Sequence, residues 1–401
     1  MENKAELAKL ITTEQGKVLA EAVGEVAYSA SFFEWFGQEC RRTYGDIVPS
    51  NKPDRQLLHM REPIGVAAMI TPWNFPIAMI ARKAAAALAC GCPCVIKPAE
   101  DTPLSALALA ELTKTAGIPD GVFNVCPSDA IKTAAVGQFM CESPKISVIS
   151  FTGSTDVGKL LLRQSASTVK RMCLELGGNA PFIVFASADI GEAVKGAMAS
   201  KFRNSGQTCV CANRFFVHRS VFDDFVDQLT TAMRGELVVG NGCQTGVSQG
   251  PLINESAVNK VERLVDDAVK KGAKVHCGVG RHPAGKCFYK PTVLSGIDQR
   301  MDIDQEEIFG PVVAITQFES EADAVRLANS VKVGLAGYFY SRDMAQIFRV
   351  ARRLEVGMVG VNTGAISTCE CAFGGVKESG LGREASYLGM DEFLQTKTDY
   401  S

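Results

Sequence analysis

The sequence predicts an α/β protein with two domains, because strands and helices alternate along most of the chain. Short apolar runs that end at Pro, such as residues 94–97, are typical of buried parallel strands, and runs with helical spacing follow them. The 401 residues also exceed what one hydrophobic core usually holds. We therefore expect parallel sheets with helices on both faces.

The first half of the chain is expected to open with helical residues 5–41 and a polar, extended segment at 42–63. The following elements are strands at 65–70, 94–97, 122–125 and 146–151, and helices at 78–88, 103–116 and 157–165. Because parallel strands present their carboxyl ends at one edge, Lys97, Glu100 and Gly153–Gly158 should share that edge, where a nucleotide would bind.

A second α/β region is expected to begin near Gly177. Its strands are placed at 182–185, 215–218 and 312–318, and its helices at 190–202, 222–234, 255–271 and 321–328. We assign residues 1–176 to a dinucleotide-binding domain and 177–375 to a catalytic domain. Residues 376–401 are expected to return to the first domain.

Composition excludes several classes of function. The formal net charge is −2 and no basic stripe is present, so we expect no nucleic-acid partner. No stretch approaches 18 apolar residues, and the charged start lacks the apolar core of a signal peptide, so we expect a soluble, intracellular protein without a membrane partner. The 14 cysteines of such a chain should be mostly reduced and buried.

One cysteine differs from the others. Cys209 lies in a polar, Gly-containing segment after a helix, where a thiol can be partly exposed and react as a thiolate. Taken alone, however, the segment favours a structural thiol over a catalytic one. Cys209 and Cys211 are too closely spaced for a zinc site, and residues 90–94 have three cysteines but no nearby His, so we expect no metal.

Three further segments suggest chemistry without proving it. Glu175, between two leucines, suits a general base or is an exposed strand residue, and Asn74 suits an oxyanion donor or is part of a packed turn. Residues 153–159 follow a strand and could bind an anion at a helix N-terminus, or form an ordinary turn. Leu160 stands where a P-loop has Ser or Thr, which argues against an ATPase.

Taken together, these segments resemble the aldehyde dehydrogenase superfamily over nearly the whole chain. The resemblance rests on residues 72–76, 97–100, 151–155, 174–178, 206–209, 307–311, 372–375, 377 and 379–380. It implies an aldehyde dehydrogenase-like fold with a Rossmann-type cofactor domain, an α/β catalytic domain and a β-strand oligomerisation element. It also implies that Cys209 attacks the aldehyde, that Asn74 and the Cys209 N–H hold the oxyanion, and that Glu175 activates water.

The resemblance further implies NAD as cofactor, with NADP as the alternative. The implied cofactor-binding residues are Thr71, Trp73, Lys97, Pro98, Ala99, Glu100, Gly153, Ser154, Thr155, Asp156, Val157, Gly158, Glu307 and Phe309. Glu100 would pair with a free ribose 2′-hydroxyl and repel a 2′-phosphate, which favours NAD.

Five segments narrow the resemblance further, namely residues 80–83, 200–204, 205–211, 333–340 and 370–375. By these segments the chain most resembles, within the superfamily, the succinate-semialdehyde dehydrogenases of 4-aminobutyrate degradation. By that resemblance Arg82, Arg203 and Ser367 bind the substrate carboxylate, a group that an arginine fork pairs with well. Glutarate semialdehyde is an alternative substrate, because one methylene changes binding by only about 1–3 kcal/mol. A third alternative is an inactive protein that retains the fold.

The resemblance carries three more expectations. Cys211 could form a disulfide with Cys209 and block it until reduction, or be a second buried thiol. Residues 42–60 and 391–401 resemble oligomerisation strands, which implies a homotetramer. The relatives extend beyond the position of Met1, so we expect an N-terminally truncated form of a mitochondrial enzyme.

Overall fold

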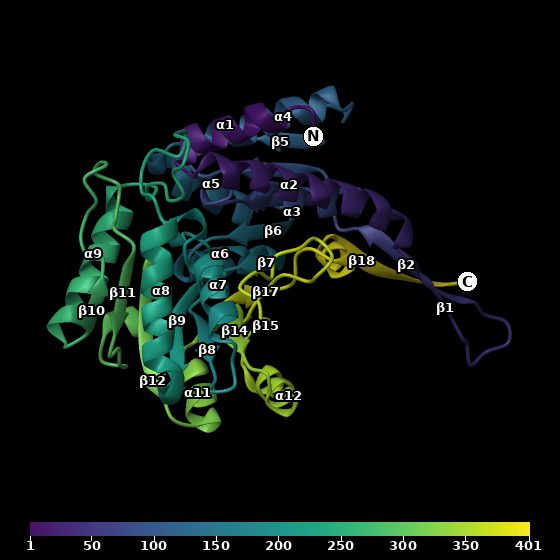
Figure 1. The fold of residues 1–401 in the computed structure, drawn as a ribbon. Coiled ribbons are helices and arrows are strands. Elements are labelled where there is room, and N and C mark those ends of the chain that lie inside the picture. The colour runs from purple at the N-terminus through teal and green to yellow at the C-terminus, as the bar shows by residue number, and fades with distance from the viewer.

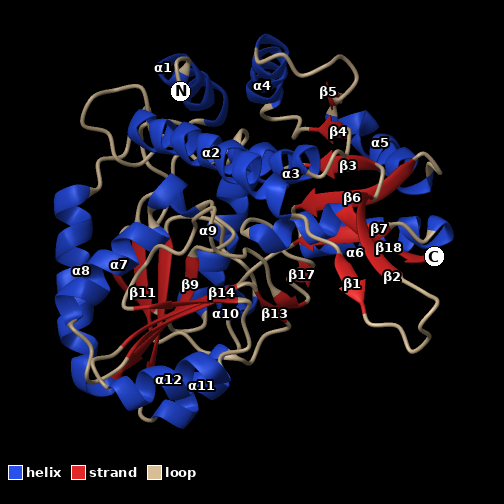
Figure 2. Ribbon diagram, turned by 90° about the vertical axis from the view of Figure 1, so that its right-hand side faces the viewer, coloured by secondary structure: helices blue, strands red, loops and turns tan.

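The computed structural model describes all residues 1–401 and contains two large sheets, which lie side by side with helices around them (Figures 1 and 2). A narrow arm made of β1, β2 and β18 extends away from both sheets, and the C-terminus lies along it (Figure 1). None of the helices combines the length and apolarity needed to cross a bilayer.

The first large sheet has six strands in the order β17-β7-β6-β3-β4-β5. Its strands are β3 (Val66–Ile70), β4 (Cys94–Lys97), β5 (Phe123–Val125), β6 (Ile146–Thr152), β7 (Arg171–Glu175) and β17 (Gly380–Leu381). Strands β3 to β7 pair in parallel, whereas β17 pairs antiparallel with β7. The carboxyl ends of β3, β4, β6 and β7 therefore share one edge, which confirms the prediction for the segments after β4 and β6.

Helices cover both faces of this sheet. They are α1 (Lys4–Gln15), α2 (Leu19–Glu39), α3 (Ala78–Ala89), α4 (Pro103–Thr115), α5 (Ala130–Glu142) and α6 (Thr155–Ser165). Helix α3 packs on β3 and β4, α2 packs on α3, and α5 packs on β6. The helix expected at 5–41 is interrupted, because Gly16 adopts a left-handed φ of 91° and ends α1.

The second large sheet has seven strands in the order β10-β11-β12-β9-β8-β14-β15. Its strands are β8 (Ala180–Val184), β9 (Ala212–His218), β10 (Lys274–Cys277), β11 (Thr292–Ser295), β12 (Val312–Phe318), β14 (Ala336–Tyr340) and β15 (Met358–Val361). Its helices are α7 (Ile190–Lys201), α8 (Phe222–Glu236), α9 (Glu255–Lys270), α10 (Asp302–Gln305), α11 (Glu321–Ala328) and α12 (Met344–Arg353).

Successive side chains of β8 pack into different cores on the two faces of the second sheet. All five of its residues are buried. Phe182 belongs to the core under α7 and α8, whereas the next residue, Ile183, belongs to the core under α11 and α12. Because successive side chains point to opposite faces, a strand that is buried on both sides appears as a continuous apolar run.

The small sheets connect distant parts of the chain. The arm has β1 (Asp46–Val48), β2 (Leu57–Pro63) and β18 (Leu394–Tyr400), all antiparallel. A two-stranded sheet pairs β13 (Val333–Gly334) with β16 (Val376–Lys377). Five short 3-10 helices are η1 (Cys40–Arg42), η2 (Ala166–Thr168), η3 (Arg203–Gly206), η4 (Arg219–Val221) and η5 (Tyr387–Phe393).

Candidate active site

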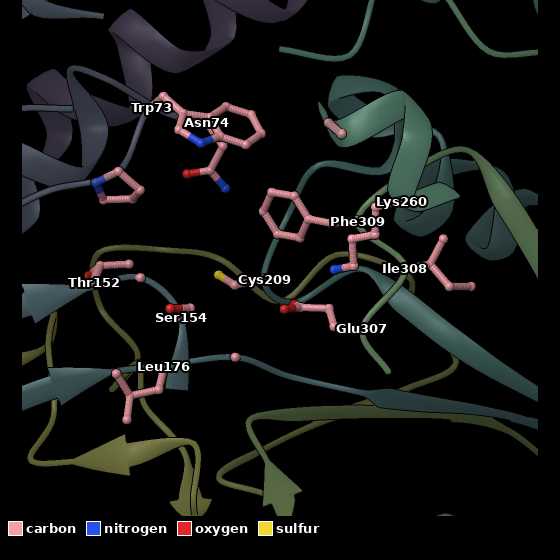
Figure 3. Close-up of a pocket in the computed structure, with 14 residues that line it drawn as sticks. Trp73, Asn74, Thr152, Ser154, Leu176, Cys209, Lys260, Glu307, Ile308 and Phe309 are labelled. Atoms are coloured by element: carbon pink, nitrogen blue, oxygen red, sulfur yellow. The ribbon is translucent and has the colours of Figure 1, made fainter. Parts of the chain in front are cut away.

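A pocket opens between the two large sheets, with a volume of about 280 Å³. Its walls come from the loop after β3, the end of β6, the segment after β7, the Cys209 loop, α9 and the segment before β12 (Figure 3). The lining residues are Pro72, Trp73, Asn74, Thr152, Gly153, Ser154, Leu176, Gly177, Cys209, Ala257, Lys260, Glu307, Ile308 and Phe309.

The backbone of the Cys209 loop adopts a rare conformation. Asn204, Ser205 and Gly206 have successive positive φ values of 49°, 57° and 78°. A Cβ on Gly206 would lie 2.2 Å from the carbonyl oxygen of Gly310, so only glycine fits there. Left-handed non-glycine residues are strained and persist only where their surroundings hold them. This turn changes the direction of the chain after α7 and leads it to Cys209, which lines the pocket.

Cys209 is partly buried, and its thiol faces the pocket. Its backbone N–H makes no hydrogen bond within the chain. Burial raises the pKa of the Cys209 thiol well above its usual value, and the nearby Glu175 carboxylate raises it further, against the opposing effect of Arg82. Both effects favour the neutral thiol in this arrangement, so we expect a nearby base to take its proton when it reacts.

Asn74 lies across the pocket from Cys209, on the loop that follows β3 (Figure 3). Its side chain is buried, and its Nδ2 donates to the carbonyl oxygen of Gln207 at 3.0 Å. An amide nitrogen has two protons, so one donor remains available. The loop of Asn74 and the loop of Cys209 are thus joined directly.

Glu175 ends β7 and is 2% exposed. Its Oε2 accepts a hydrogen bond from Arg82 Nη2 at 2.6 Å and another from Thr152 Oγ1 at 3.1 Å. Its Oε1 is buried and has no partner. Such an oxygen is available to accept a proton from a thiol or a water molecule.

A buried charge network extends from Glu175 into the protein. Arg82 pairs with both Glu175 and Glu384, and Lys83 pairs with Glu384 and donates to Thr152 Oγ1 at 2.6 Å. All four ionisable side chains are at most 5% exposed. Two cations balance two carboxylates, which avoids the large cost of an unpaired buried charge.

Residues on the side of the pocket formed by the start of α6 and by the segment before β12 could bind a dinucleotide. Ser154 caps the N-terminus of α6, where free N–H groups favour an anion, and Gly153 precedes it. Bare backbone at Gly177 leaves room beside Glu307, because a Cβ there would lie 3.4 Å from Glu307 Oε2. Burial raises the pKa of Glu307 to about 7, so its charge changes near neutrality. Phe309 packs edge-on against Trp73 with ring centres 5.6 Å apart.

The other predicted cofactor residues lie along the same sheet edge. Lys97 is buried at the end of β4 and its Nζ is 3.3 Å from Glu100 Oε2, while the Glu100 side chain is 40% exposed. Thr71, Pro98 and Ala99 are buried next to Lys97. Thr155, Asp156, Val157 and Gly158 form the first turn of α6. None of these residues lines the 280 Å³ pocket itself.

The predicted substrate residues have different surroundings. Arg82 is fully engaged by two carboxylates and stacks on Phe373 at 4.0 Å. Arg203 is partly buried, stacks over Phe75 at 4.9 Å and takes part in no ion pair. Ser367 is partly buried in the loop after β15.

Cys211 is buried two residues beyond Cys209, and both thiols are reduced. The Sγ of Cys211 lies 3.6 Å from the carbonyl oxygen of Lys201. Lys201 is fully buried and its Nζ has no hydrogen-bond partner. Burial raises the pKa of Cys211, and the Lys201 ammonium opposes that shift.

Sequence reasoning missed several residues of the site. Lys260 on α9 lines the pocket, and Glu384 and Lys83 anchor the network behind Glu175. No local pattern marks any of them, because each meets its partners only through the fold. Thr152 could have been found, since it ends β6 directly before the predicted anion-binding segment.

Comparison with known proteins supplies a further set of findings. The model of the aldehyde dehydrogenase family matches residues 1–398. The mitochondrial succinate-semialdehyde dehydrogenase of Rattus norvegicus is 59% identical over 397 residues, which are 99% of this chain and 76% of that protein. The glutarate-semialdehyde dehydrogenase of Pseudomonas aeruginosa is 52% identical, over 99% of this chain and 81% of that protein. A crystal structure described as an NADP-dependent enzyme of E. coli superposes with a TM-score of 0.98 at 52% identity, covering 100% of this chain and 82% of that one.

Proposed function

The chain belongs to the aldehyde dehydrogenase family, and from this premise we propose that it oxidises succinate semialdehyde to succinate with NAD(P). The observation that carries the proposal is the meeting of Cys209 and Asn74 around one pocket, with Glu175 beside Cys209. These three groups provide a nucleophile, an oxyanion donor and a base. We also propose residues 1–176 and 376–401 as the cofactor domain, and 177–375 as the catalytic domain.

The mechanism follows from these positions. The free Oε1 of Glu175 takes the proton of the Cys209 thiol as sulfur bonds to the aldehyde carbon. Asn74 Nδ2 and the Cys209 N–H stabilise the oxyanion, each worth about 10²–10³ in rate. The bound dinucleotide supplies the acceptor for the hydride. Glu175 must first release the thiol proton to solvent, and its carboxylate then removes a proton from the water that attacks the Cys209 thioester, so that the acid is released and the Cys209 thiol is restored.

The cofactor would be held along the edge of the six-stranded sheet. We propose that Gly153 and Ser154 bind the pyrophosphate, Glu307 the nicotinamide ribose, and Lys97 with Glu100 the adenosine ribose. The free N–H groups at the start of α6 support the first assignment.

We propose that the substrate carboxylate pairs with Arg203, assisted by Arg82 and Ser367. Arg203 forms no ion pair and stacks on Phe75, whereas Arg82 already pairs with two carboxylates. Glutarate semialdehyde is a second candidate, which the relative of that name in Pseudomonas aeruginosa favours.

Replacing Arg203 with methionine should raise KM for succinate semialdehyde about 10- to 100-fold, the worth of a charge-assisted hydrogen bond. Butanal has the same carbon chain without the carboxylate, so its kinetics should change little. Steady-state assays of NAD reduction with both aldehydes measure the difference. An equal rise in KM for the two aldehydes would show that Arg203 does not bind the carboxylate.

We propose a preference for NAD over NADP because the Glu100 carboxylate would repel a ribose 2′-phosphate. Glu100→Gln should therefore raise kcat/KM for NADP by about tenfold and leave that for NAD within a few fold. The two cofactors are compared at saturating aldehyde. A wild-type enzyme that already uses NADP better would overturn this preference, and the E. coli neighbour described as NADP-dependent makes the comparison necessary.

We propose that Cys211 forms a disulfide with Cys209 under oxidising conditions, which blocks the nucleophile until the disulfide is reduced. Peroxide would oxidise the Cys209 thiol to a sulfenic acid, and the Cys211 thiol would then displace water to form a disulfide. Wild-type activity lost to peroxide should return with dithiothreitol, whereas Cys211→Ala should stay inactive because its Cys209 oxidises further. The idea fails if the variant recovers as fully as wild type.

The remaining expectations concern assembly and location. We propose a homotetramer in which the arm of β1, β2 and β18 contacts other subunits, because β18 is almost wholly exposed. Sedimentation equilibrium tests this, and a monomer would refute it. We propose a mitochondrial location from the resemblance alone, and fractionation of cells that express the protein would check it.

A further inference from the structure

Three ionisable residues near the start of α2 contact both loops that form the reaction site, although none of them lines the pocket. They are Lys17, Glu21 and Glu25. The side chains of Lys17 and Glu25 are completely buried and form an ion pair. The reaction mechanism described above uses none of them.

Lys17 and Glu25 together hold the Asn74 loop. Lys17 Nζ donates to the Asn74 carbonyl oxygen at 2.8 Å and lies over the Phe75 ring at 3.6 Å. Glu25 Oε1 accepts the backbone N–H groups of Ile77 at 3.0 Å and Ala78 at 3.3 Å, at the start of α3. The ion pair thus holds this loop at its middle and at its carboxyl-terminal end.

Glu21 holds the Cys209 loop at its most strained point. Both of its carboxylate oxygens lie 3.0 Å from the backbone N of Asn204, the first of the three left-handed residues. Arg203 precedes Asn204 and stacks on the same Phe75 ring that carries Lys17. Glu21 therefore restrains the backbone beside the proposed carboxylate-binding arginine.

The two loops are also tied to each other at two carbonyl oxygens. The Asn74 oxygen accepts from both Lys17 Nζ and Asn204 Nδ2, the latter at 3.0 Å. The Gln207 oxygen accepts from Asn74 Nδ2 at 3.0 Å and Asn204 Nδ2 at 3.2 Å. If Lys17 moved, these shared hydrogen bonds would also displace the side chain of Asn74, which faces Cys209.

We propose that Lys17, Glu21 and Glu25 are positioning residues that fix Asn74 relative to Cys209, so that an oxyanion formed on Cys209 meets its donor. This inference rests on the proposed role of Asn74. A buried ion pair is seldom more stabilising than apolar residues of the same size, so stability alone does not account for Lys17 and Glu25. A displacement of about 1 Å at a reacting group can cost about 10²-fold in rate.

The test uses the double variant Lys17→Met with Glu25→Gln. It removes both charges together, and the glutamine retains an oxygen for the Ile77 and Ala78 amides. The readout is acylation of Cys209 by p-nitrophenyl acetate, followed as nitrophenolate release. This reaction forms an oxyanion on Cys209 but needs neither aldehyde nor dinucleotide, so it stays informative even if the proposed substrate is wrong.

The double variant should slow acylation about tenfold in the wild-type background. In the Asn74→Ala background it should slow acylation less than about twofold, because the amide that the ion pair positions is already absent. An equal loss in both backgrounds would overturn the proposal. A stability control is Val265→Ala, which empties a buried position on α9 away from both loops and should leave acylation unchanged at a temperature where all variants are folded.

Glu21 provides an independent test, because it is only partly buried and its loss endangers folding less. Glu21→Leu should slow acylation about tenfold, and Glu21→Gln, which retains an acceptor for Asn204 N–H, should recover most of the rate. A leucine variant as fast as wild type would contradict the proposal, as would a glutamine variant as slow as leucine.

Discussion

Replacing Cys209 with alanine should lower NAD reduction by more than about 10⁴-fold, because no other group can form the covalent intermediate. Cys209 is the only cysteine among the residues that line the pocket. Dinucleotide binding should persist, because the proposed cofactor contacts lie on other elements. Activity is measured from NADH absorbance, and binding by calorimetry.

Cys141→Ala is the matched control, because it removes a buried thiol from the core beside α5 and β6. It should retain wild-type kcat. A Cys209→Ala enzyme that still turns over would refute the covalent mechanism, and one that no longer binds NAD would show that the loss is not confined to the chemistry.

Glu175→Gln should lower steady-state turnover by about 10²- to 10⁴-fold, the usual worth of a general base. The glutamine can still accept from Arg82 and Thr152, so the network should keep its shape. If the first proton can leave the thiol to solvent at high pH, the variant should show a burst of about one NADH per active site before it stalls as a thioester.

Stopped-flow absorbance measures the burst, and mass spectrometry of the quenched protein identifies the acyl group on Cys209. Glu378→Gln is the control, because Glu378 pairs with Lys159 at the surface near the same sheet edge. Rapid turnover in Glu175→Gln, or a permanent acyl group in the control, would contradict the assignment of the base.

The pattern of apolar runs predicted most of the secondary structure that surrounds the site. Strand β12 and helix α11 have the predicted bounds, and the carboxyl ends of β3, β4 and β6 meet at one edge as expected. Local patterns suffice for these elements because β12 is a largely apolar, buried run and the buried residues of α11 recur at helical spacing. The same patterns gave no bounds for α5, α12 or β7, although α5 and α12 each begin after a capping Asp.

The charge network could not be predicted for a different reason. Arg82 and Glu384 are 302 positions apart, and nothing in either neighbourhood indicates the other. The raised pKa of Cys209 has the same origin, because it depends on burial and on Glu175 from another strand. Sequence patterns predict which residue types come near an edge, whereas burial and pairing follow from the assembled fold.

The antiparallel pairing of β17 with β7 means that a late part of the chain completes the surroundings of Glu175. Gly380 sits directly opposite Glu175, and a Cβ there would lie 1.8 Å from the Leu174 carbonyl oxygen. Residue 384 supplies the carboxylate that balances Arg82 and Lys83. During synthesis Cys209 leaves the ribosome long before these residues do, so the nascent chain carries its nucleophile without a finished base. The charge network behind Glu175 can therefore close only when translation is almost complete.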